Sequence, residues 1–524
     1  MESFPWLTVL GAIPLLGAIV VAALPKGRET LAKQVALAVS LVVLVLTIAM
    51  ALQFDAGAEG FQFAERYSWI PAFGASYAVG VDGIALVLIG LAAILTPVCI
   101  LASWHDAHGE PVMGRPAGEA APSSRRRREQ TFFALLLSLE TFMIGVFAAT
   151  DVFLFYVFFE AMLVPMYFII GSFGGPQRSY AAVKFLLYSL LGGLLMLASV
   201  IGLYVVSDGG PQAFLFENVA GLEIGTTTQR WLFLGFFIAF AIKAPLFPVH
   251  TWLPDAAAES PPGAAVLLVA VLDKVGTFGM LRYCLPIFPD ASKWATPVVL
   301  ALSVIGIIYG ALLAIGQSDI KRLIAYTSIS HFGFIVMGIF AMTSQGQAGS
   351  TLYMVNHGFS TAALFLLAGW MISRRGSRMV EDFRGVQRVA PVLAGCFLVA
   401  GLSGLALPGL SSFVSEFLVL AGTYTRYQWV AVIATVGIIL ASLYILLLYQ
   451  RTMTGPVHPE HATMPDLHRR EIVAIAPVLA IILALGIFPR PLLDVITPAV
   501  NRTLAAVDVT DPEPSHPVAE GTSK

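Results

Sequence analysis

Charge is scarce in this chain of 524 residues: only 12% of them are Asp, Glu, Lys or Arg, while 57% are hydrophobic. A chain with so little charge is not a water-soluble domain. Cysteine is also rare, and Cys99, Cys284 and Cys396 form no CxxC pair. Their wide spacing favours plain buried thiols over a metal cluster or a disulfide framework.

Several binding motifs are missing as well. The chain has no Rossmann glycine fingerprint and no Walker loop, so it has no recognisable means of binding nicotinamide or ATP. The basic residues occur in short blocks between apolar runs and the net charge is only −2, so no nucleic-acid partner is expected. Energy for any transport must therefore come from a partner.

Long apolar runs dominate the sequence instead. Runs of roughly 20 residues, long enough to cross a bilayer as a helix, recur along almost the whole chain. They predict an all-α polytopic membrane protein with about fourteen transmembrane helices. The first run, Phe4 to Leu24, has no basic residue before it and no small-residue cleavage pattern after it. We interpret it as a retained helix and not as a signal peptide.

Helix-breaking residues fall inside two of the predicted spans. Residues 240–254 contain three prolines, and Pro408 with Gly409 interrupts the apolar run 401–412. Such breaks persist in a bilayer only where protein or a water-filled cavity satisfies the freed backbone groups. These spans are the seventh and the twelfth, and the odd offset between them predicts two five-helix repeats of inverted topology, as in many transporters.

The predicted organisation has five segments. They are residues 1–130 with helices 1–3 and a basic cytoplasmic loop, 131–290 with helices 4–8, 291–455 with helices 9–13, 456–490 with helix 14, and a polar tail at 491–524. We expect the tail to be extended or disordered. The loop, residues 105–130, ends in four arginines that we attribute to topology and to anionic lipid headgroups. Basic residues on alternate connections predict that this side faces the cytoplasm and that both termini face outward.

Ionisable residues inside apolar spans are the candidate functional residues. They are Glu160, Lys243, Lys274, His331, His357 and Glu416, with Asp273 beside Lys274. Each costs at least ~2.5 kcal/mol at a helix centre, so their number indicates pairing or use. Two structural explanations stay open: an inert ion pair for Glu160 with Lys243, and hydrogen-bonded core residues for the histidines.

These residue types can together carry protons. A lysine exchanges protons near neutrality only if its pKa falls far below about 10.4; burial lowers a lysine pKa and a nearby carboxylate raises it. Movement of Glu160 relative to Lys243 would therefore switch the lysine, and the break at Pro245 gives water a place to reach it. Lys274, His331 and Glu416 would continue the relay. As an alternative, His331 and His357 could hold a haem.

Six segments resemble the antiporter-like membrane subunits of respiratory complex I. They are FFEAMLVPMYF (158–168), KAPLFPVHTWLPDA (243–256), LLVAVLDKVGTFGMLRY (267–283), KRLIAYTSISHFGF (321–334), NHGFSTAALFLLAG (356–369) and LSGLALPGLSSFVSEFLVL (402–420). The resemblance runs from about Thr131 to Gln450. It implies a proton-translocating subunit of a bacterial plasma-membrane NADH:quinone oxidoreductase. That subunit would have no redox cofactor of its own, and flavin, iron–sulfur clusters and quinone would lie in partner subunits.

The resemblance also implies residue roles. Glu160 matches the fifth-helix glutamate, Lys243 the seventh-helix lysine that it controls and Lys274 the eighth-helix lysine. His331 matches the central histidine and Glu416 the twelfth-helix exit residue, where paralogues usually have lysine. We include His357 in the same relay.

Some positions depart from the family pattern. Ala257 stands where many relatives have histidine, Asp273 replaces an apolar residue, and Glu140 is an extra acid in the fourth span. Side chains of successive helical residues point about 100° apart, so we expect Asp273 not to need Lys274 as its partner. Two other functions remain as alternatives: an Mrp-type cation/proton antiporter subunit, and a structural membrane spacer.

Overall fold

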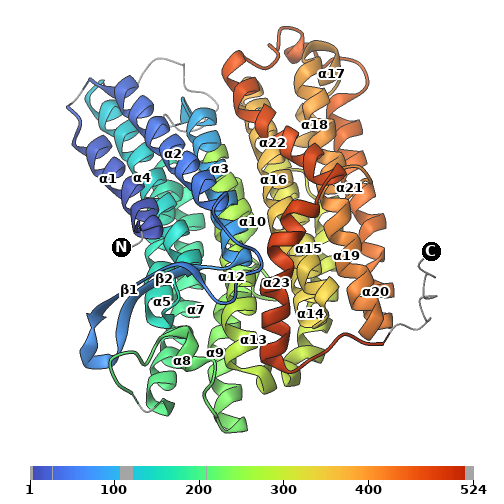
Figure 1. Ribbon diagram of the computed structural model, residues 1–524. Helices are drawn as coiled ribbons and strands as arrows, with labels where there is room; N and C mark the ends of the chain where they lie inside the picture. Colours follow the sequence, from blue (N-terminus) through green and yellow to red (C-terminus); the bar gives the residue numbers. More distant parts are fainter. Residues whose placement is uncertain (1–3, 26, 107–121, 208, 514–524) are drawn as a thin grey trace, which may run out of the picture.

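The protein is a bundle of long helices that run roughly parallel to one another (Figure 1). The computed structural model describes residues 4–25, 27–106, 122–207 and 209–513. Within these ranges, twelve helices are long and apolar enough to cross a membrane. The prediction of an all-α polytopic membrane protein is therefore confirmed.

The membrane-spanning helices follow the apolar runs of the sequence. The continuous ones are α1 (Trp6–Ala23), α2 (Glu29–Ala51), α3 (Gly83–Ala102), α4 (Pro122–Ala148), α5 (Val152–Ala161) with α6 (Leu163–Phe173), α7 (Arg178–Val206), α14 (Pro289–Ile315), α15 (Ile320–Phe340), α16 (Ser344–Arg375), α20 (Gln428–Ala434) with α21 (Val436–Met453), and α22 (Arg469–Ile487). The remaining span, residues 262–287, consists of α11 (Pro262–Leu267), α12 (Lys274–Gly279) and α13 (Leu285–Ile287) joined by two π-helical segments.

Both predicted helix breaks are present. The first separates α9 (Thr226–Lys243) from α10 (Trp252–Glu259), and the second separates α18 (Pro391–Gly404) from α19 (Ser411–Arg426). Proline lacks the amide hydrogen that continues a helix, which explains why each helix stops where it does. Lys243 therefore ends a helix next to one break, and Glu416 lies in the second turn of the helix that follows the other.

Three spans form the centre of the bundle. Residues 262–287, α15 and α16 are buried along almost their whole length, whereas α1, α2, α7 and α21 expose one face. Lys274, His331 and His357 lie on these three central spans. The protein thus places its buried titratable groups where neighbouring helices, and not lipid, surround them.

The sequence did not predict a β-hairpin, which lies beside α5 at the left of Figure 1. Strands β1 (Gln62–Ile70) and β2 (Ala75–Val81) pair antiparallel, and Glu65 on β1 accepts a hydrogen bond from the amide of Leu7 in α1. Asp151, which caps α5, accepts a hydrogen bond from the amide of Ser76. The hairpin therefore connects α1 to the start of α5.

Ion pairs join the connections at the opposite end. Arg378 contacts Glu259 at 2.9 Å and Asp319 at 2.8 Å, and Arg374 contacts Glu471 at 2.5 Å. These basic residues belong to connections that we assigned to one side of the membrane from their charge. That this side faces the cytoplasm stays a prediction.

Two predictions about the connections are wrong. The loop expected over residues 105–130 ends earlier, because α4 begins at Pro122 and includes the four arginines. The tail expected to be extended contains helix α23 (Arg490–Val507), which packs against α3 and α16. Its buried residues recur at helical spacing, as in Ile496, Val500 and Val507, so the helix is stabilised by one apolar face. The rest of the predicted loop and the tail beyond residue 513 lie outside the described residues.

Candidate functional site

Lys274 makes the most contacts of the predicted residues. Its ammonium donates hydrogen bonds to Val269 O (2.8 Å), Asp273 Oδ1 (3.0 Å) and His357 Nδ1 (2.6 Å), and the lysine is fully buried. We expected that Asp273 does not need Lys274 as its partner, but the structure pairs the two. The π-helical segment Leu268–Leu272 ends just before these residues, and the long lysine side chain folds back along its own helix to reach both oxygens. π-helical turns of this kind are frequent at functional sites.

A second set of hydrogen bonds leads to Glu416. His331 packs against His357 with ring centres 5.3 Å apart, and its Nδ1 lies 2.7 Å from the hydroxyl of Tyr353. The Tyr353 hydroxyl donates to Glu416 Oε2 at 2.8 Å. Because Tyr353 gives its only proton to the carboxylate, its oxygen accepts from Nδ1–H of His331. All four side chains are buried.

Glu160 and Lys243 face each other at the first break without a direct bond. Within the described residues, neither the Lys243 ammonium nor Glu160 Oε1 has a hydrogen-bond partner, although the two groups lie within electrostatic range. The ammonium lies 5.0 Å from the ring centre of Phe159 and 5.6 Å from that of Phe185, which are cation–π distances. A Cβ on Gly193 would collide with the Glu160 carboxyl, so glycine in α7 leaves room for it. A small movement of either side chain would change their interaction strongly.

The predicted residues therefore form a line and a neighbouring pair. Lys274, His357, His331 and Glu416 are connected by hydrogen bonds and one ring contact, with Tyr353 as the added member. The Lys243 ammonium lies within electrostatic range of Asp273, the carboxylate bonded to Lys274. The Glu160–Lys243 pair thus interacts electrostatically with the Lys274 end of the line. Glu416 forms the other end.

Sequence reasoning missed two side chains of the site. Tyr353 lies one turn before His357 on α16, so the spacing alone could have pointed to it. His250 lies within the first break, is buried, stacks against Phe247 and meets Tyr309 edge-on. Its Nδ1 has no hydrogen-bond partner among the described residues. A histidine inside a stretch of three prolines was the available signal.

The geometry argues against a haem between the histidines. The rings of His331 and His357 are in direct contact, which leaves no space for a macrocycle between them. Nδ1 of each ring is already engaged, with Tyr353 in one case and Lys274 in the other. In the part of the chain that the structure describes, no group of three His, Cys, Asp or Glu residues is placed to hold a metal ion.

Glu140 lies apart from the line. It is fully buried in α4, and neither of its carboxyl oxygens has a hydrogen-bond partner within the described ranges. None of the other predicted site residues is bonded to it. It is therefore a matched comparison for the acids that belong to the line.

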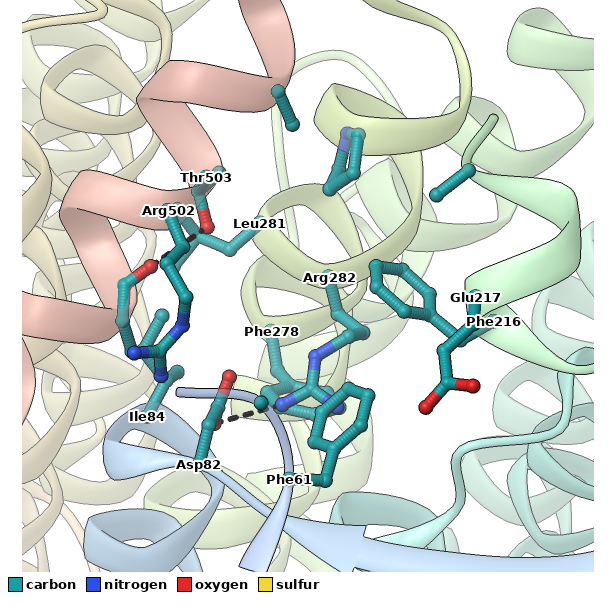
Figure 2. Close-up of a pocket in the computed structure, with 15 residues that line it drawn as sticks. Phe61, Asp82, Ile84, Phe216, Glu217, Phe278, Leu281, Arg282, Arg502 and Thr503 are labelled. Atoms are coloured by element: carbon teal, nitrogen blue, oxygen red, sulfur yellow. Dashed lines mark hydrogen bonds and ion pairs between the residues drawn. The ribbon is translucent and has the colours of Figure 1, made fainter. Parts of the chain in front are cut away.

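A cavity of about 220 Å³ lies near the hairpin end and is also separate from the line (Figure 2). Arg282 and Asp82 form an ion pair of 2.8 Å at its wall, and Phe61 and Phe278 cover the guanidinium at 4.6 and 5.0 Å. Arg502 of α23 lines another side. None of the six predicted site residues lines this cavity, so it is not a continuation of their path.

Known proteins share this sequence and arrangement. A family model described as "NADH:quinone oxidoreductase/Mrp antiporter, TM" matches residues 149–441, more than half of the chain. NADH-quinone oxidoreductase subunit M of Mycobacterium tuberculosis is 53% identical over 100% of this chain and 99% of its own length. Paralogues usually have lysine where Glu416 stands, so this glutamate favours the subunit M branch of the family, and the relative confirms that assignment.

Solved structures with a similar fold support the same family assignment. A chain of respiratory complex I from Thermus thermophilus with bound NADH superposes with a TM-score of 0.84 at 30% identity, covering 96% of this chain and 99% of that one. A chain of the Mrp complex from Dietzia sp. DQ12-45-1b gives a TM-score of 0.81 at 23% identity over 96% and 98%, which shows a shared fold. The chain therefore belongs to the NADH:quinone oxidoreductase/Mrp antiporter family of membrane subunits, in the group of subunit M.

Proposed function

We propose that this chain is a proton-translocating membrane subunit of a respiratory NADH:quinone oxidoreductase. The residues that would carry or control the protons are Glu160, Lys243, Lys274, His357, His331 and Glu416, with Tyr353 as a bridge. The observation that supports this most directly is the buried run of contacts from Lys274 to Glu416. A purely structural ion pair does not explain a line of hydrogen bonds and one ring contact that joins four helices, α12, α15, α16 and α19.

The proton steps follow from the donors and acceptors. Lys274 already donates to His357 Nδ1, so a proton can pass to the imidazole along an existing hydrogen bond of 2.6 Å. Transfer from His357 to His331 needs a ring movement that brings two ring nitrogens together, because Nε2 of His357 has no hydrogen-bond partner among the described residues. His331 then passes the proton through the Tyr353 hydroxyl, which donates to Glu416. Each member then needs a new proton from the Lys243 side before the next cycle.

Glu160 would control the start of this sequence. When its carboxylate approaches Lys243, the ammonium is stabilised and holds its proton. When it withdraws, the buried ammonium loses its counter-charge and releases a proton towards Asp273 and Lys274. The lack of a direct bond between Glu160 and Lys243 is consistent with a pair that changes its separation.

The driving energy would come from partner subunits. The T. thermophilus structure is a respiratory complex with bound NADH, and we place flavin, iron–sulfur clusters and quinone in the corresponding partners of this chain, with no redox centre in the chain itself. We further place the protein in a bacterial plasma membrane with both termini outward, on the basis of its alternating basic connections. Lateral neighbours and lipid would cover its exposed apolar helices.

An Mrp-type cation/proton antiporter subunit is the second candidate, because the family model covers both groups and the Mrp complex shares the fold. A structural spacer is the third. Blue-native isolation of the tagged chain from solubilised membranes distinguishes them. Co-migration with flavin and iron–sulfur proteins and with NADH dehydrogenase activity supports the proposal. Migration in a redox-inactive antiporter complex would contradict it.

A further inference from the structure

A chain of buried hydroxyl groups lies at the second helix break. Ser360 of α16 is 2.5 Å from Ser403 of α18 and 3.2 Å from Ser412 of α19, measured between Oγ atoms. Ser403 is in turn 3.4 Å from Ser411. All four side chains are at most 3% exposed. Four hydroxyls from three helices thus follow one another without an apolar gap.

These serines differ from most other buried hydroxyl residues of the protein. Thr96, Ser303 and Thr452 each donate to the carbonyl four residues earlier in their own helix, at 2.8 Å in every case. That bond is the usual way to satisfy a helical hydroxyl in a membrane. The Oγ atoms of Ser360 and Ser403 bond instead to hydroxyls of other residues. These hydroxyl groups therefore form hydrogen bonds between helices, and not within a single helix.

The hydroxyl chain ends on α19, the helix that carries Glu416. Ser412 lies four residues before Glu416 on α19, a rise of about 6 Å along the helix axis that one water molecule can bridge. Asn356 donates to the Ser411 carbonyl at 2.7 Å and to Ser415 Oγ at 3.2 Å. Its buried Oδ1 has no hydrogen-bond partner among the described residues, so it is available to hold such a water.

We propose that the serine chain, Ser411–Ser403–Ser360–Ser412, is a proton-conducting branch that reaches Glu416 from the helix break. A hydroxyl both donates and accepts, so each serine takes a proton on its lone pair and passes its own proton onward. Only O–H bonds form and break, and the charge leaves at the far end. Glu416 then has two proton contacts, Tyr353 on one side and the serine branch on the other. This inference rests on the proposed function, because it assumes that Glu416 titrates during pumping.

The test is a set of substitutions at the centre of the branch. Ser360→Ala removes the one oxygen that contacts both Ser403 and Ser412, while Ser360→Thr keeps it. Ser303→Ala is the matched control, because Ser303 is equally buried and its hydroxyl bonds only to its own helix. In vesicles with equal amounts of assembled complex, we expect NADH-driven pumping to fall about threefold in Ser360→Ala. Ser360→Thr and Ser303→Ala should pump as the unmodified protein does.

Two results would overturn the inference: normal pumping by Ser360→Ala, or equal losses in the Ala and Thr variants, which would indicate a packing role. If Ser360→Ala does not assemble, Ser403→Ala interrupts the same chain and is judged by the same outcomes. In a Glu416→Gln background the serine substitution should have no further effect, because the branch then has no acceptor. Normal pumping by Lys243→Ala would instead contradict the proposed function itself, so the two failures are distinguishable.

Discussion

The two helix breaks surround their charged residues in different ways. At the first break, Lys243 contacts aromatic rings and faces Glu160, and its ammonium has no hydrogen bond within the described residues. At the second break, Glu416 accepts a hydrogen bond from Tyr353, and hydroxyl groups occupy the neighbouring turn. The first break therefore holds two opposite charges with few hydrogen bonds. The second break holds a single acid that is surrounded by many hydrogen-bonding groups.

This difference indicates different tasks. A charge pair without hydrogen bonds responds to a small movement, because the interaction of buried charges changes steeply with distance. An acid within a hydrogen-bonded network is held in place and exchanges protons with its partners. We infer that the first break switches and the second conducts. The two helix breaks should consequently differ in how the pumping losses of single substitutions combine in double variants.

Glu160→Gln should have the largest effect, because it removes the charge that we propose controls Lys243. We expect NADH-driven pumping in vesicles to fall about tenfold or more at normal assembly. The double variant with Lys243→Ala should pump no worse than the worse single variant, because both residues act as one unit. Glu140→Gln makes the same chemical change at a buried acid outside the line and should leave pumping unchanged. Losses that multiply in the double variant would show that the pair does not act together.

Glu416 should tolerate any substitution that keeps a titratable group. Glu416→Gln preserves the shape but cannot release a proton, and we expect roughly a fivefold to tenfold loss of pumping. Glu416→Asp should retain substantial activity. Glu416→Lys should retain part of it, because the family resemblance implies lysine at this position in paralogues. Equal pumping by Gln and Glu in intact vesicles would leave only a structural role for this residue.

Tyr353→Phe should have the smallest effect of the three. It removes one hydroxyl and keeps the ring, so the contact between His331 and Glu416 loses its bridge while the packing remains. A water molecule can replace the hydroxyl, so we expect a loss of pumping of roughly two- to fivefold. A loss of pumping as large as that of Glu160→Gln would mean that Tyr353 does more than connect His331 to Glu416. Tyr283→Phe is the control, because Tyr283 is also fully buried and its hydroxyl donates to the carbonyl of Ala149 and not to a member of the line.

The sequence predicted the helices and both breaks because the bilayer restricts what a chain can do. Apolar length gives the spans, and proline fixes where α9 and α18 stop. The hairpin was not predicted, because the sequences of β1 and β2 have no pattern as distinctive as the long apolar run of a membrane-spanning helix. Helix α23 was overlooked because its apolar residues cover only one face and never form a continuous run.

The candidate site was predictable in composition but not in order. A charged residue inside an apolar run is easy to recognise in the sequence, which is why Lys274 and Glu416 could be predicted. Contacts between helices cannot be read from spacing along one helix, so the bridge through Tyr353 and the serine branch needed the structure. The pairing of Asp273 with Lys274 was mispredicted because an ideal helix was assumed where the chain forms a π-helical turn.

The ratio of protons pumped to electrons transferred by purified complex carrying Lys243→Ala tests the central claim most directly. The ratio is measured in proteoliposomes with NADH and quinone and compared with that of Lys33→Ala, a buried lysine paired with Glu129 away from the line. We expect a lower ratio for Lys243→Ala and an unchanged ratio for Lys33→Ala, at equal assembly. An unchanged ratio for a correctly assembled Lys243→Ala complex would contradict the claim that protons pass through this line.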